Sequence, residues 1–170
     1  MNEQALMDVI ERLRNRFYGK YRGTVTEIDT TQKGRIKAKV PAVLGDTPTG
    51  WCLPCVPYAG DQAAICFLPE RGAGVWIEFE GGDPSFPIWV GCYWHDNEIP
   101  DRVKPDVKVI RTKANQEIVL DDHAHSISIS DGSGNSVTMD QQGIAIVRQG
   151  GKIMIKDRNI TFNTDGMEVT

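Results

Sequence analysis

The sequence has few of the features that define several common classes of protein. It contains four cysteines in 170 residues, too few for the disulfide framework of a small secreted domain. No apolar stretch approaches the roughly 18 residues that a membrane-spanning helix needs. The first residues, MNEQALMDVIERLRN, lack the apolar core of a signal peptide. We therefore expect a chain that is made and folds in the cytoplasm.

The sequence also has no cluster of positive charge. Lysine and arginine total 19 against 23 acidic residues, which gives a net charge of −4. A general nucleic-acid binder needs clustered basic side chains that displace counterions from phosphates. The nearest candidate, the run from Arg12 to Arg22, is short and interleaved with apolar residues, as on the solvated face of a helix. We expect no nucleic-acid partner.

What is present divides into a short helix, an all-β region and a repetitive tail. Apolar residues at helical spacing, from Leu6 to Leu13, predict a helix over residues 1–17. Residues 18–97 predict a small β-barrel, residues 98–107 a charged connector with two prolines, and residues 108–170 a series of very short strands. The predicted class is all-β with one short N-terminal helix.

The barrel prediction depends on strict alternation between turn signals. Ile36, Ala38 and Val40 share one parity in the run RIKAKV, and the run VWIEF at 75–79 alternates in the same way. The second pattern points Trp76 outward. We expect Trp76, together with Trp89, to contribute to an interface with another subunit or a hub protein.

The tail contains seven apolar pairs at positions i and i+2, separated by turn residues such as DGSGN at 131–135. Sheets this narrow leave their apolar face wet unless another layer covers it. Identical chains wound around a shared axis would bury all of these faces in one rod. We therefore predict an intertwined rod of identical chains with this core: Ile118, Leu120, Ile127, Ile129, Val137, Met139, Ile144, Ile146, Ile153, Ile155, Ile160 and Phe162.

The order of barrel, connector and repeat resembles a known family. The stretches GTVTEIDTTQKGRIKAKVPAVLG (23–45) and LPCVPYAGDQAAICFLPERGAGVWIEFEGGDPSFPIWVGCYW (53–94) are similar to the oligonucleotide/oligosaccharide-binding (OB) barrel of contractile-tail spikes. ANQEIVLDDHAHSISISDGSGNSVTMDQQGIAI (114–146) is similar to the start of their triple-stranded β-helix. The family comprises the phage baseplate assembly protein V group and the related VgrG spikes of type VI secretion.

The resemblance implies a homotrimer, in which the rod of identical chains is a three-chain spike that punctures a target envelope mechanically. The implied partners are a baseplate hub protein, the tail tube and transiently the target membrane, with a separate tip-capping protein left open. The implied location is the virion tail baseplate or an injection particle, after assembly in the cytoplasm. Some relatives carry a lysozyme domain between barrel and rod, but this connector leaves no room for one. We expect no enzyme activity.

The stretch GWCLPC at 50–55 looks like the W-C-x-P-C site of a thioredoxin-type oxidoreductase. That chemistry requires the first cysteine at a helix N-terminus, where the helix dipole lowers its pKa. Here VPYAG follows Cys55, and this segment cannot begin a helix of any length. The redox interpretation therefore fails on local structure.

The sequence suggests two hypothetical metal sites. We expect no other cofactor. Cys52, Cys55, Cys92 and His95 have the C-x2-C and C-x2-H spacing of a structural zinc site, against the alternative that the cysteines are buried free thiols. On a three-fold axis, His123 and His125 of three chains would supply six imidazoles, which would suit an octahedral metal such as iron. The alternative for both histidines is an exposed turn.

A second functional class is a binding module. An OB barrel with the aromatic residues of this region could hold single-stranded nucleic acid or glycan, with the repeat as an oligomerisation stalk. The net negative charge of the chain favours the spike over this alternative.

Overall fold

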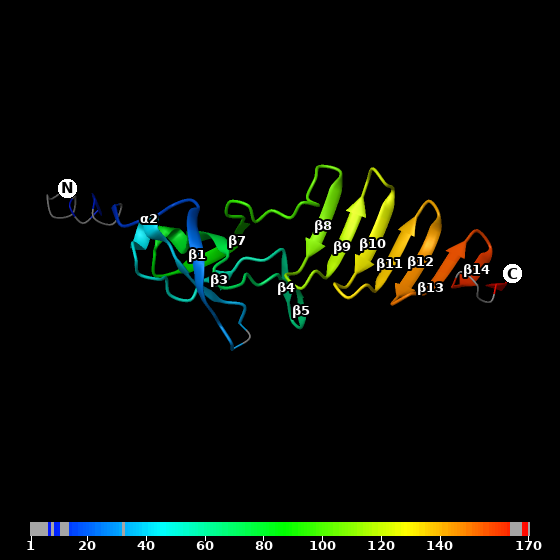
Figure 1. The fold of residues 1–170 in the computed structure, drawn as a ribbon. Helices are drawn as coiled ribbons and strands as arrows, with labels where there is room; N and C mark the ends of the chain where they lie inside the picture. Colours follow the sequence, from blue (N-terminus) through cyan, green and yellow to red (C-terminus); the bar gives the residue numbers. More distant parts are fainter. Residues whose placement is uncertain (1–6, 8, 11–13, 32, 164–167, 170) are drawn as a thin grey trace. The chain divides into compact units, whose positions relative to one another are not determined.

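The structure is a computed structural model that describes the chain except residues 1–6, 8, 11–13, 32, 164–167 and 170 (Figure 1). It consists of two compact units, Met1–Glu98 and Ile99–Thr170. Among the described residues, the regular elements of both units are almost all strands, which confirms the predicted all-β class. The helix predicted over residues 1–17 lies largely outside the described residues. No helix among the described residues is long and apolar enough to cross a membrane.

The first unit is a five-stranded sheet with a separate hairpin. The sheet order is β2-β1-β6-β7-β3, and β4 pairs with β5 in a second, two-stranded sheet. One helical turn, α2, follows β2 and begins at a proline, whose fixed φ suits the first helical position. The element bounds are β1 Tyr21–Ile28, β2 Ile36–Lys39, α2 Pro41–Leu44, β3 Leu53–Pro54, β4 Tyr58–Gly60, β5 Ala63–Ile65, β6 Gly74–Phe79, the 3-10 turn Glu80–Gly82, and β7 Pro87–Tyr93.

Alternation along these strands builds the barrel core. Ile36, Ala38 and Val40 are fully buried, as their parity predicts. On β6 the core side chains are those of Val75, Ile77 and Phe79. A fully buried aliphatic side chain of this size stabilises a fold by roughly 1.5–3 kcal/mol. The complete buried cluster is Val25, Ile36, Ala38, Val40, Cys52, Val75, Ile77, Phe79 and Trp89.

One of the two predicted interface tryptophans is a core residue instead. Trp89 is 3% exposed, and its Nε1 donates a hydrogen bond to the carbonyl of Gly34 at 3.0 Å. It lies directly opposite Ile77, which fixes it on the buried face of the sheet. Trp76 is partly exposed on the other face, as predicted. The expected pairing of Trp89 with Trp76 at an interface is therefore wrong.

The second unit is one antiparallel sheet of eight strands in sequence order from β8 to β15. Figure 1 shows β8 to β14 as successive strands joined by short turns. The predicted apolar pairs fall in β9 to β15 in their predicted order, although Met167 lies outside the described residues. The bounds are β8 Val107–Arg111, β9 Glu117–Asp121, β10 Ser126–Ser130, β11 Ser136–Asp140, β12 Gly143–Arg148, β13 Gly151–Lys156, β14 Asn159–Phe162 and β15 Glu168–Val169.

Candidate functional site

The register of the second unit places the twelve predicted core residues in two parallel rows. Ile118 lies opposite Ile129, which lies opposite Val137, and the same relation continues strand by strand. We call the two rows the apolar double row. The first row is Ile118, Ile129, Val137, Ile146, Ile153 and Phe162; the second is Leu120, Ile127, Met139, Ile144, Ile155 and Ile160.

Within a single chain the apolar double row is uncovered. Ten of its twelve side chains are 37–49% exposed, and only Val137 and Ile153 are less accessible. A contiguous apolar surface of this kind marks an interaction site in a water-soluble protein. The sheet therefore presents a continuous face that requires a partner layer.

The opposite face of the same sheet is mixed, with small, polar and some apolar side chains. Ser128 and Thr138 are neighbours across β10 and β11, and Ala145 and Met154 are neighbours across β12 and β13. This alternation gives the sheet one apolar face and one mixed face, as expected for a sheet with one solvated side.

The connector is anchored to the first strands of this sheet by charge. Glu117, 9% exposed, forms ion pairs with Arg111 at 2.9 Å and with Arg102 at 3.5 Å. Lys108 pairs with Asp122, whose backbone N–H donates to the carbonyl of Asp106. The connector therefore contacts β9 through the side chain of Arg102 and the turn after β9 through the backbone of Asp106.

Turn chemistry fixes the strand register on which the apolar double row depends. Asp131 accepts hydrogen bonds at Oδ1 from the backbone N–H groups of Ser133 (2.9 Å) and Asn135 (3.0 Å). Hydrogen bonds from Asn135, with that from Ser133, hold the pKa of Asp131 below its ordinary value. A carboxylate that caps its own turn favours one loop geometry, and a shift of one residue would turn every apolar side chain to the other face.

The histidine pair lies in the turn between β9 and β10. His123 and His125 are both exposed, and His125 has a positive φ of 49°. The strand pairing closes at Asp121 and Ser126, so the histidines lie beyond the strand ends, to the side of the second apolar row. The described part of one chain brings no third ligand to them. Iron binding stays a hypothesis, which requires the histidines of several chains to meet at one site.

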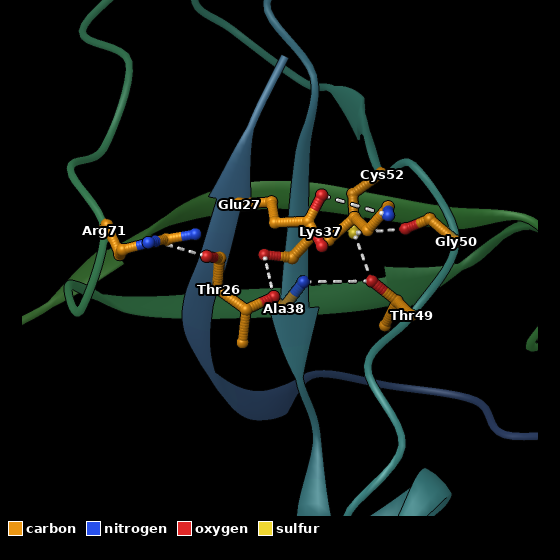
Figure 2. Close-up of polar contacts among 8 residues, drawn as sticks. All are labelled: Thr26, Glu27, Lys37, Ala38, Thr49, Gly50, Cys52 and Arg71. Atoms are coloured by element: carbon orange, nitrogen blue, oxygen red, sulfur yellow. Dashed lines mark hydrogen bonds and ion pairs between the residues drawn. The ribbon is translucent and has the colours of Figure 1, made fainter.

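The four residues of the zinc hypothesis have different environments. Cys52 is buried, whereas Cys55 and Cys92 are exposed, and the backbone N–H of His95 is bonded to Glu98. Figure 2 shows Thr49 between the backbone N–H of Ala38 and Sγ of Cys52, which lies 3.2 Å from the threonine hydroxyl. Within the described residues, no group of three or more His, Cys, Asp or Glu is placed to hold a metal ion.

The local structure around GWCLPC does not support thiol chemistry. Burial raises the pKa of Cys52, which is the opposite of what an attacking thiolate needs. Cys55 is followed by strand β4 rather than by a helix, so no helix dipole acts on either thiol. Cys52 instead belongs to the buried cluster of the barrel.

A feature that sequence reasoning missed is an arginine that lies against two adjacent aromatic rings on the outer face of the barrel. The guanidinium carbon of Arg22 lies 5.8 Å from the ring centroids of both Trp76 and Tyr93. Both rings lie on neighbouring strands, and their centroids are 5.3 Å apart. Such cation–π contacts hold the guanidinium in place while leaving its edges available.

Glycine makes room for this arrangement. The Tyr93 hydroxyl donates to the carbonyl of Gly23 at 3.2 Å. A Cβ atom on Gly74 would lie 2.7 Å from the carbonyl oxygen of Tyr93 and 2.8 Å from its ring. The ring therefore occupies the space that a side chain at position 74 would need.

Arg22 itself has no carboxylate partner among the residues that the structure describes, although nearby Lys20 pairs with Glu78. Next to it is an open groove of about 430 Å³. We call this surface the aromatic barrel face. The groove is lined by Arg22, Trp76, Tyr93, Trp94, His95 and Asp96.

Comparison with known proteins matches both units. A family model described as the type VI secretion system/phage-baseplate injector OB domain matches residues 21–94. A second, described as the phage baseplate V C-terminal trimerisation domain, matches residues 107–168. These two family matches confirm the predicted OB barrel and the predicted trimerising tail.

A curated protein similar to the chain is the actin cross-linking toxin VgrG1 of Vibrio cholerae serotype O1. The two are 30% identical over 97 residues, which cover 53% of this chain and 9% of the toxin. The chain thus spans only a small part of that relative.

Proposed function

The chain belongs to the family of phage-baseplate and type VI secretion injector proteins, and on that premise we propose that it is a central spike that docks on a baseplate hub and punctures a target envelope. A structural role as a baseplate spike component follows from the family itself. Docking on the hub and tube, and puncture, are the steps proposed here. The action is mechanical, without catalysis or a cofactor.

The observation that carries the proposal is the apolar double row. A single chain leaves this surface open to water over six strands, from β9 to β14. Three chains that close these faces against one another would form a rod with no exposed sheet edge along its length. Such a rod is stiff and narrow, which are the properties that puncture requires.

We further propose that the aromatic barrel face is where the hub binds. Tryptophan, tyrosine and arginine are the residues that dominate binding energy at protein interfaces. The guanidinium edge of Arg22 is free to take a carboxylate of the hub in two parallel hydrogen bonds. Asp96 and His95 at the rim would contribute polar contacts around that centre.

Complementation of a producer strain that lacks the chain tests both steps. Wild-type protein should restore particles that carry the spike and release potassium from target cells. Arg22→Glu should reduce the spike that sediments with particles at least tenfold, whereas the matched charge change Lys33→Glu, in the exposed turn after β1, should not. Normal spike incorporation with Arg22→Glu would remove this face from the hub contact.

One observation favours the binding-module alternative: Trp94 is 59% exposed beside the groove, as a stacking surface for a sugar ring would be. Titration of the protein with bacterial cell-wall oligosaccharides, followed by tryptophan fluorescence, tests it. The spike proposal expects no saturable change, and a change abolished by Trp94→Ala would favour the binding module.

A further inference from the structure

The β4–β5 hairpin is an apolar projection, and neither of its strands pairs with a strand of the barrel sheet in the described part of the chain. Tyr58–Gly60 pairs only with Ala63–Ile65, in a sheet of its own. Every residue from 57 to 68 is exposed except Ala63. The segment from 51 to 69 carries a single charged side chain, that of Asp61.

The large side chains of this hairpin face water. Tyr58 and Ile65 lie directly opposite each other and are 53% and 51% exposed, and Phe67 just beyond is 66% exposed. A two-stranded hairpin alone is at best marginally stable in water. The hairpin therefore needs a packing partner, and its lack of charge points to an apolar one.

The trimerisation domain would bring such a partner within reach, because it would hold the barrels of three chains close together. The first unit ends at Glu98, and the matched trimerisation domain begins at residue 107. A linking segment of this length extends to roughly 30 Å at most. Three barrels tethered in this way meet at an effective concentration on the order of millimolar.

We propose that the β4–β5 hairpin of each barrel packs against the barrel of a neighbouring chain in the same trimer. Permanent contacts between identical chains are the most apolar class of interface and resemble a domain core. The residues from Trp51 to Pro69 have that character, whereas the aromatic barrel face, with its arginine and its acidic rim, has the polar character of a contact between different proteins. The proposal rests on the trimeric spike proposed above.

Cys66 makes this contact measurable in the intact trimer, because it lies between Ile65 and Phe67 and is exposed in the single chain. The test protein is the full chain with Cys55→Ser and Cys92→Ser, which leaves Cys66 and the buried Cys52. A benzophenone maleimide attached to Cys66 should, on irradiation, link each chain covalently to the barrel of its neighbour. The yield of dimer on a denaturing gel should not change on tenfold dilution, and Cys66→Ser should abolish it.

A second variant separates the hairpin contact from general damage. Phe67→Asp should lower the cross-linking yield at least fivefold while sedimentation still gives a trimer. The matched change Gln62→Asp, at the hairpin turn and away from the apolar side chains, should leave the yield unchanged.

The outcomes are distinct. A trimer that gives no Cys66 cross-link, or one whose yield rises with protein concentration, overturns the hairpin contact and leaves the spike intact. A monomer in sedimentation overturns the trimeric spike and the hairpin contact together.

Discussion

Ile144 on β12 lies directly opposite Ile155 on β13, and each exposes 37% of its surface in a single chain. Both belong to the second row of the apolar double row. The central claim, that three chains bury this surface, depends on pairs of this kind. Their substitution gives the first test.

Ile144→Asp should abolish trimer formation. Each trimer would hold three uncompensated carboxylates near its axis, and the effective penalty for burying a charge is roughly several kcal/mol per ion. Sedimentation should shift from trimer to monomer or aggregate. Ala145→Asp is the matched control, because the neighbouring side chain points to the opposite face of β12 and should leave the trimer intact. A soluble trimer of the Ile144 variant would show that this face is not the axis.

The barrel should lose stability in acid through Asp29. Hydrogen bonds from the hydroxyl and backbone N–H of Thr31, with those from Arg35, lower the pKa of Asp29 to about 2. An unfolded aspartate titrates near 3.9. The unfolded state therefore binds the proton first, and the contribution of Asp29 is complete above about pH 4 and is lost as the pH falls towards 2.

This acid sensitivity can be measured by thermal unfolding between pH 7 and pH 2. Asp29→Asn should lower the melting temperature at pH 7 and reduce the difference between neutral and acid pH. Asp101→Asn, at an exposed position in the connector, should follow the wild-type curve. Equal acid sensitivity of wild type and Asp29→Asn would mean that Asp29 does not contribute.

The thiols should react according to burial and without catalysis. Cys55 is exposed and should react with a thiol reagent in the folded protein, whereas Cys52 should react only after unfolding, because it is buried and its pKa is raised. The protein should not accelerate insulin disulfide reduction above the rate in buffer. Rapid labelling of Cys52 in the folded state, together with such turnover, would revive the oxidoreductase interpretation.

Much of this fold could be predicted from the sequence because strand alternation is a local signal. The parity of Ile36, Ala38 and Val40 gave the barrel core, and the i, i+2 pairs gave twelve positions that the strand register places in two continuous rows. Strand β8 escaped prediction because Lys108 stands where an apolar residue would complete its pair. Ile110 extends the first row opposite Ile118, but Lys108 faces Leu120 in the second.

The elements that could not be predicted depend on contacts between distant segments. The run from Phe86 to Val90 is apolar at nearly every position, so it has no alternation from which the burial of Trp89 could be read. In the sequence, Arg22 looks like any exposed strand residue. Its contact with Tyr93 joins segments far apart in the chain: Tyr93 is hydrogen-bonded to Gly23, 70 residues earlier. The isolation of the β4–β5 hairpin is likewise a property of sheet pairing, which the local sequence does not encode.

The most direct test of the central claim is the absolute mass of the full-length protein in solution by analytical ultracentrifugation at micromolar concentration. The account predicts a single species with three times the 18.9 kDa mass of one chain. It also predicts that the mass persists on dilution, since the apolar double row is buried along the whole rod. A stable monomer would contradict the account, because the exposed face of β9 to β14 would then have no partner chain to cover it.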